Sequence, residues 1–253
     1  MISTELIKNI IYKIPIVKYI YSYNRQRRNR WVKIESKKIT INSKVLDIGA
    51  GNCPYRSYFS HCDYKAHDFH QLDENQLQDS VGYGKIDYIS DILAIPVEDN
   101  TFDVILCTEV IEHVPYPILA IKQYARILRP GGVLLITAPL QSGIHQIPYH
   151  FYGGFTKFWY MKILSEYSFS EIEINENGGL FTSHMAMGLT MLKLLLNEVF
   201  KVKTWKVIPS ILLIVIYAPF IALIFPILSF ALDHIYKERN YTAGYHVKAI
   251  KCS

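Results

Sequence analysis

The chain has 253 residues, half of which are hydrophobic, and a formal net charge of +5. This length allows one α/β domain with a large core plus an appendage. The basic residues are spread without the dense run that is typical of nucleic-acid binding, so we expect no nucleic-acid partner.

Residues 1–42 carry an amphipathic pattern followed by a basic segment. Between residues 2 and 21, apolar side chains recur at three- and four-residue spacings, which predicts a helix bent or interrupted at Pro15. The basic segment contains Arg25, Arg27, Arg28, Arg30 and Lys33. Two interpretations stay open: a helix packed on the domain with a solvated basic tail, or a helix lying on an anionic membrane surface.

The compartment follows from the N-terminus and the cysteines. Charged residues interrupt the apolar N-terminal segment before a hydrophobic signal region forms, so we predict no secretory signal. No C-x-x-C pair is present, which favours a reducing compartment over a disulfide framework. The cysteines are Cys53, Cys62, Cys107 and Cys252.

Residues 45–55, VLDIGAGNCPY, form a short apolar run that ends in a glycine-rich turn. The pattern predicts a buried strand, a tight turn and a helix that starts over residues 55–59. Gly49 and Gly51 lack a Cβ and therefore permit the backbone to approach a ligand closely. The turn lacks the third glycine of the dinucleotide fingerprint and the Gly-Lys-Ser/Thr ending of a phosphate loop. A tight turn without a ligand is the alternative.

The next segments alternate between strand and helix patterns with short turns, which favours a parallel sheet covered on both faces. Residues 104–107 and 133–138 are continuous apolar runs, as in buried parallel strands. The other predicted elements are strands at 64–68, 86–92 and 167–174, and helices at 116–128 and 156–164.

Two acids follow predicted strands at informative positions. Asp68 lies 19 residues after Gly49, close to the roughly 20-residue spacing at which Rossmann-like folds place a ribose-binding carboxylate. Asp91 ends the segment 86–92. Alone, Asp68 would be an ordinary surface acid, but behind this glycine turn we favour a ligand role.

Several motifs, taken together, resemble the class I S-adenosylmethionine (SAM) methyltransferases, with the type 11 subgroup closest. They are Asp47–Gly51, Asp68, Asp91, Phe102–Asp103, Glu109–His113 and Leu128–Gly132, in the order and spacing of that family. The resemblance covers residues 43–180 and 241–253. It implies an α/β, Rossmann-like class I methyltransferase fold, a parallel sheet with an antiparallel last strand, and SAM as cofactor. It points to enzymes associated with cell-envelope glycan or lipid modification.

The resemblance also implies roles for individual residues. Asp47, Gly49 and Gly51 would hold the methionine part of SAM, and Glu109 would border it. Asp68 would bind the ribose. Asp91 would accept a hydrogen bond from the adenine amino group, and Ile92 would pack against the ring.

Histidines supply the candidate catalytic bases, because an imidazole titrates near neutrality. His113 follows a strand, where we expect it to shape the loop. His145 and His150 flank Pro148 and Tyr149, and this segment resembles type 11 enzymes that act on lipid-linked or polysaccharide substrates. No H-x-x-x-H motif or Cys/His cluster appears, so we predict no metal site.

Residues 181–240 read as an apolar helical insertion before the last strand. The 26 residues from Val207 to Leu232 carry no charge, which exceeds the roughly 20 residues needed to span a bilayer. However, residues 241–253 must return to the same sheet as residues 43–180. We therefore expect a hairpin entering one leaflet, with its turn near Pro219, or a helix lying in the interface plane, at the cytoplasmic face of a membrane. An oligomer interface is the competing interpretation.

These features together predict a membrane-associated SAM-dependent methyltransferase. The main hypothesis is O-methylation of a sugar hydroxyl in a cell-envelope glycan or its lipid-linked precursor. One alternative is methylation of a quinone or other isoprenoid lipid. Another is a catalytically inactive SAM-fold subunit that binds at the membrane.

Overall fold

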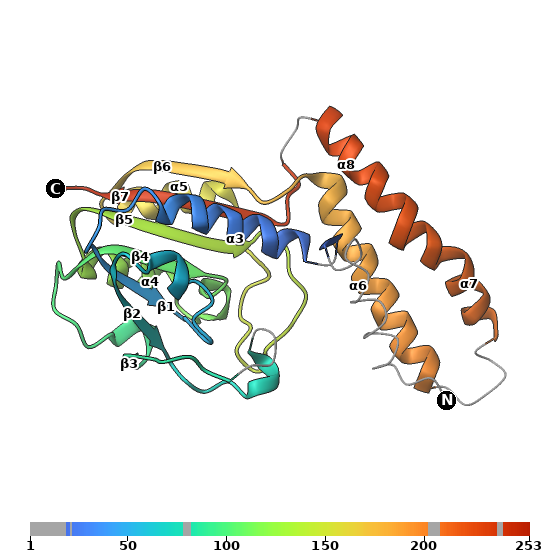
Figure 1. Ribbon diagram of the computed structural model, residues 1–253, viewed down its shortest axis with the longest axis horizontal. Coiled ribbons are helices and arrows are strands. Elements are labelled where there is room, and N and C mark those ends of the chain that lie inside the picture. The colour runs from blue at the N-terminus through green and yellow to red at the C-terminus, as the bar shows by residue number, and fades with distance from the viewer. Residues whose placement is uncertain (1–18, 21, 78–81, 202–207, 237–239) are drawn as a thin grey trace. The chain divides into compact units, whose positions relative to one another are not determined.

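The computed structural model describes residues 19–20, 22–77, 82–201, 208–236 and 240–253 (Figure 1). The chain divides into two compact units. One unit comprises residues 28–177 and 244–253. The other comprises the described residues up to 27 and those between 178 and 243. Apart from Tyr19 and Ile20, the predicted N-terminal helix and its bend at Pro15 lie outside the described residues.

The first unit is built on a seven-stranded sheet with the order β3-β2-β1-β4-β5-β7-β6 (Figure 1). β7 is antiparallel to both of its neighbours, whereas β1 is parallel to β2 and β4, and β4 is parallel to β5. This arrangement confirms the predicted fold. The strands are β1 (Lys44–Ile48), β2 (Asp63–Asp68), β3 (Tyr88–Ile89), β4 (Phe102–Thr108), β5 (Leu128–Pro139), β6 (Phe169–Glu176) and β7 (Gly244–Lys251).

Helices cover both faces of the sheet, because its central strands are apolar on both sides. In β4, Ile105 and Cys107 belong to one core cluster, and Val104 and Leu106 to the other. The first cluster is covered by helices α4 (Pro117–Ile127) and α5 (Lys157–Glu166). The second includes Val32 of helix α3 (Tyr23–Ser36).

The prediction of a helix that starts over residues 55–59 is wrong. Those residues form only a short 3-10 segment, Arg56–Phe59. Cys53, two residues before Tyr55, adopts a left-handed backbone with φ +56, so no right-handed helix includes it. Val32 of α3 is completely buried and contributes to the core on the same face of the sheet. The short segment still packs on the sheet, because Tyr55 and Phe59 are buried in the same core cluster as Val32.

The other unit contains the segment between β6 and β7. It forms α6 (Leu180–Lys201), α7 (Ile208–Pro219), a π-helical turn (Phe220–Ile224) and α8 (Phe225–Ile235). Pro219 has helical angles, φ −62 and ψ −38, so the turn predicted near Pro219 is wrong. A π-turn lets the helical path continue past the missing proline N–H.

The helical segments of this unit are held by a small apolar core and one buried acid. The core consists of Ile20, Met185, Leu192 and Ile221. The Asp233 carboxylate accepts hydrogen bonds from the backbone N–H groups of Gly179, Phe181 and Thr182, at 2.9–3.2 Å. These N–H groups belong to the start of α6, so a charge from α8 caps that helix. None of the helices described is both long and apolar enough to cross a membrane.

Candidate functional site

Two cavities lie where β1, β2 and β4 end, at the edge of the sheet where parallel α/β folds bind ligands. The first has a volume of about 330 Å³ and the second about 480 Å³. They share four lining residues and therefore adjoin. The shared residues are Gly49, Phe69, Val110 and His113.

The glycine turn after β1 forms one wall of the first cavity. Gly49 has φ +69, and a Cβ on it would overlap the side chain of Val110. Gly51 has φ +52, and its N–H donates to the Asp68 carboxylate at 2.9 Å. Only glycine both adopts this positive φ freely and avoids the overlap with Val110, so the local structure requires glycine at residue 49.

Asp47 is a buried acid at the base of the same cavity, 1% exposed. Burial raises the pKa of its carboxyl to about 7, although a hydrogen bond from the Tyr64 hydroxyl opposes the shift and nearby Asp68 adds to it. A carboxyl with a pKa near neutrality gains charge readily when a cation binds beside it.

Asp68 and Asp91 line different cavities. Asp68 lies in the first, is 4% exposed, and also accepts from the His70 backbone N–H at 2.9 Å. Asp91 lies in the second, beside Ile92, and its carboxylate accepts from the Leu93 N–H at 2.8 Å. Each carboxylate oxygen has two lone-pair sites, so both acids retain capacity to accept hydrogen bonds from a ligand.

Arg28 is a residue of this site that the sequence did not reveal. Its guanidinium lies 3.1 Å from the Glu109 carboxylate and donates to the Tyr55 hydroxyl at 3.0 Å. Burial opposes the charge, but Glu109 raises the pKa of Arg28 above its usual value. Glu109 also accepts from the Thr137 hydroxyl at 2.8 Å and adopts φ +54. The sequence alone does not distinguish Arg28 from the other basic residues of this segment. Its role depends on where α3 places it relative to the sheet.

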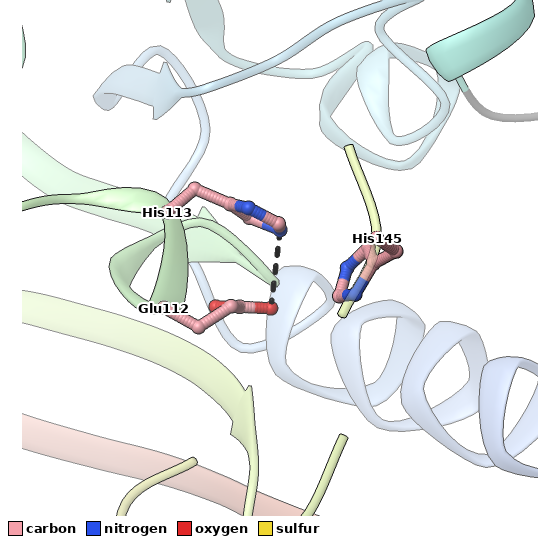
Figure 2. Close-up of side chains that lie close together, drawn as sticks. All are labelled: Glu112, His113 and His145. Carbon is pink, nitrogen blue, oxygen red and sulfur yellow. Dashed lines mark ion pairs between the residues drawn. The ribbon is translucent and has the colours of Figure 1, made fainter. Parts of the chain in front are cut away.

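Glu112, His113 and His145 lie together on the other side of the first cavity (Figure 2). One ligand atom from each lies within 4.8 Å of the others. His150 adjoins them, with its ring 4.6 Å from that of His145 and 5.5 Å from that of His113 between centroids. Its Nε2 is 3.1 Å from the Ser142 hydroxyl.

The surroundings change the protonation of these groups. Burial lowers the pKa of His113 to about 4, and the other two histidines add to this shift, while a hydrogen bond to the Tyr149 carbonyl opposes it. Burial and His145 lower the pKa of His150. Burial and Glu109 raise the pKa of Glu112 well above its usual value. His113 is therefore neutral at physiological pH.

The structure brings most of the predicted site residues to the two cavities. The first is lined by Asp47, Gly49, Gly51, Asp68, Glu109, His113 and His145, and the second by Gly49, Asp91, Ile92 and His113. His150 lines neither of these two cavities. The roles assigned to these residues stay predictions. The cluster of potential ligands was missed because Glu112 and His145 are far apart in the sequence.

Comparison with known proteins agrees with this geometry. Residues 46–136 match the family model described as a methyltransferase domain. The match contains the end of β1, the glycine turn, Asp68, Asp91 and the loop after β4.

Curated relatives are distant. A demethylmenaquinone methyltransferase from Staphylococcus haemolyticus is 24% identical over 162 residues, covering 57% of this chain and 66% of the relative. A ubiquinone/menaquinone biosynthesis C-methyltransferase from Idiomarina loihiensis is 26% identical over 162 residues, covering 59% and 64%. The chain thus spans less than two thirds of the length of these relatives.

Solved structures share the fold at low identity. One described as a sarcosine dimethylglycine methyltransferase from Galdieria sulphuraria superposes with a TM-score of 0.52 at 16% identity, covering 89% of this chain and 84% of that one. A phosphoethanolamine N-methyltransferase 2 from Haemonchus contortus, in complex with S-adenosyl-L-methionine, gives 0.50 at 15% identity, covering 93% and 56%. Residues 46–136 therefore match a methyltransferase domain in sequence, and the sheet that contains them has the Rossmann-like fold of these solved structures.

Proposed function

We propose that the protein transfers the methyl group of SAM to an apolar acceptor of the isoprenoid-quinone class. The observation that carries the cofactor assignment is the pair of adjoining cavities beside the glycine turn, with Asp68 on one and Asp91 on the other. A ligand with separate amino-acid, ribose and base parts would extend across both. The methyltransferase domain at residues 46–136 supports the reaction class.

The residues present fit SAM. Asp47 is buried with a raised pKa, so the cationic amino group of a methionine moiety would stabilise its charged form. Asp68 can accept from ribose hydroxyls, and Ile92 offers an apolar surface beside Asp91. SAM supplies a methyl group on a sulfonium for in-line displacement, so the protein's main task is to position the two reacting atoms.

Thermal unfolding tests the cofactor. SAM and S-adenosylhomocysteine should each raise the melting temperature in a concentration-dependent way. At a ligand concentration of one hundred times Kd, the free energy of unfolding should increase by about 2.7 kcal/mol. Asp68→Ala should abolish the rise. Asp63→Ala, at the opposite end of the same strand and exposed, is the matched control and should retain it. No shift for the parent protein would overturn the proposal.

The acceptor class rests on the names of the relatives and on an apolar groove. The relatives are named for menaquinone and ubiquinone methylation. A third cavity, of about 450 Å³, adjoins the second through Pro115. Its walls include Tyr116, Ile118, Leu119, Tyr152, Phe155 and Trp159. We place the apolar chain of the acceptor in this groove, with its ring in the cavities beside it.

Steady-state kinetics with two acceptors tests the groove. Leu119→Asp puts a charge on its wall and should raise KM for a quinone precursor with an isoprenoid tail at least tenfold. KM for a tail-less ring analogue should not change. Ile41→Asp, an exposed apolar position away from the groove, is the control. Equal effects on the two acceptors would remove the groove from substrate binding.

Labelled methyl transfer into fractionated extracts separates the acceptor hypotheses. Label should enter the quinone fraction of a lipid extract. Label in glycan or lipid-linked sugar fractions instead would restore O-methylation of a sugar hydroxyl, which the relatives do not favour. SAM binding without label in any fraction would indicate a catalytically inactive binding subunit.

We place contact with a membrane surface on the helical unit. Exposed apolar side chains recur at three- and four-residue spacings along it, and residues 207–232 carry no charge. On α6 they are Met187, Met191, Leu194 and Leu195, and from α7 to α8 they are Ile216, Phe220, Ile224, Ile227, Leu228 and Ile235. Such stripes are typical of helices that lie in the interface of a bilayer.

Flotation with anionic phospholipid vesicles tests this location. The parent protein should float, and the double variant Ile216→Lys, Ile227→Lys should remain in the dense fraction. Ile41→Lys, equally exposed but on the sheet unit, should float. If the double variant floats like the parent, the stripe is not the contact. If it instead changes from oligomer to monomer in solution, the stripe is an oligomer interface.

A further inference from the structure

We infer that Glu112, His113 and His145 bind a divalent transition-metal ion. The three side chains come from the loop after β4 and the loop after β5, and they meet at the wall of the first cavity (Figure 2). Two imidazoles and one carboxylate are a common ligand set for zinc and for non-haem iron.

The two imidazoles have a hydrogen-bond pattern suited to metal binding. His113 Nδ1 lies 2.8 Å from the Tyr149 carbonyl oxygen, and His145 Nδ1 lies 2.9 Å from that of Gly143. A carbonyl oxygen only accepts, so both Nδ1 atoms carry the proton and both Nε2 atoms present a lone pair. Metal-binding histidines ordinarily donate their second nitrogen in this way, which fixes the tautomer and the ring orientation.

Glu112 is the acid of the set. Its side chain is 1% exposed, and its Oε2 atom has no hydrogen-bond partner among the described residues. Its Oε1 lies 3.8 Å from His113 Nε2, along the dashed line in Figure 2. Oε1 is therefore the oxygen that a cation held between Glu112 and His113 would bind.

The spacing requires only a small adjustment. The ligand atoms lie within 4.8 Å of one another, whereas ligands at zinc distances of 2.0–2.2 Å are separated by about 3.4 Å in a tetrahedral site. Glu112 and His113 are already near that separation. His145 is exposed on the loop after β5, so its ring can approach the other two without disturbing the core.

Three protein ligands leave at least one coordination position open. The cavity beside this position is also lined by Asp47 and Glu109. An acceptor oxygen entering the cavity could occupy the open position, where a cation would lower the pKa of a hydroxyl. That role rests on the proposed function, but metal binding itself does not.

Metal titration of the full chain tests the site. Chelator-treated protein, without SAM, is titrated calorimetrically with Zn²⁺, and bound Co²⁺ is followed by its visible absorption. We expect one ion per chain and a higher melting temperature. His145→Ala, which alters an exposed side chain, and the near-isosteric Glu112→Gln should each weaken binding more than about tenfold. His61→Ala, a histidine outside the cluster, should bind like the parent.

The outcomes are separable from those of the cofactor test. Failure of the parent protein to bind Zn²⁺, or unchanged affinity in both His145→Ala and Glu112→Gln, would overturn the metal site. SAM binding by the parent is measured independently, so a protein that binds SAM and not Zn²⁺ keeps the proposed function and loses this inference. A protein that binds Zn²⁺ and not SAM does the reverse.

Discussion

Arg28 of α3 and Glu109 after β4 form an ion pair of 3.1 Å at the wall of the first cavity. The side chain of Arg28 is 13% exposed and that of Glu109 is 35% exposed. The pair joins a helix that precedes the sheet to the loop in which Glu112 and His113 also lie. The position of α3, which packs on one face of the sheet, therefore affects the geometry of the site.

Removal of Arg28 should destabilise this unit and distort the loop. Arg28→Ala removes one hydrogen-bond donor to the Tyr55 hydroxyl and the ion-pair partner of Glu109, and we expect a loss of about 2 kcal/mol in the free energy of unfolding. Denaturant titration measures the change. Arg30→Ala, an exposed arginine on the same helix, should change stability by less than about 0.5 kcal/mol. Equal effects would mean that the ion pair contributes nothing.

Asp47 should make stability depend on pH. Its native pKa is about 7, above the ordinary value of 3.8, so the folded state binds more protons than the unfolded state between these values. The free energy of unfolding should fall as pH rises from about 4 to 7, by up to roughly 4 kcal/mol relative to Asp47→Asn, and then level off. Denaturation of both proteins across this range measures the difference.

Tyr64→Phe provides the check on that prediction. The Tyr64 hydroxyl donates to Asp47 and opposes the upward shift of its pKa. Without this donor the fall in stability should extend to higher pH. A parent protein and an Asp47→Asn variant with parallel pH profiles would show that Asp47 titrates normally.

Gly49→Ala should be more damaging than a positive φ alone explains. Residue 49 combines φ +69 with an overlap between its Cβ and Val110. We expect about 1–2 kcal/mol from the backbone and a further 1–3 kcal/mol from overpacking. Gly131→Ala is the control, since it has φ +75 but no atom within 4 Å of its Cβ. If the two variants lose equal stability, the Val110 side chain can move away from the added Cβ without a measurable loss of stability.

Asp233 should hold the start of α6. Asp233→Ala removes an anion that accepts from three backbone N–H groups and the Thr182 hydroxyl. The expected cost is about 3 kcal/mol in this unit. Hydrogen exchange of the Phe181 and Thr182 amides should accelerate. His234→Ala, the exposed neighbour on α8, should leave these amides protected; comparable acceleration in both would contradict the cap.

The sequence predicted the sheet well because each of its signals is local. Apolar runs such as residues 104–107 fit only a strand covered on both faces, and the glycine turn follows its strand immediately. The spacing of Asp68 and Asp91 then placed both acids at the same sheet edge. These residues line the cavities that the structure contains.

The errors arose where distant segments compete. Residues 55–59 form only a 3-10 segment, and they share their core cluster with Val32, which is not close in sequence. Pro219 predicts a break in isolation, yet a π-turn absorbs the proline within a helical path. Likewise, Glu112 and His145 come from different loops, so no spacing rule could reveal their proximity.

The position of β7 gives the chain an order of assembly. β7 lies between β5 and β6, and β6 pairs with no other strand in the sheet. During synthesis on the ribosome, β6 must therefore wait for the whole of residues 178–243 before its partner emerges. The apolar helices are made while two strand edges are still unpaired and prone to aggregate.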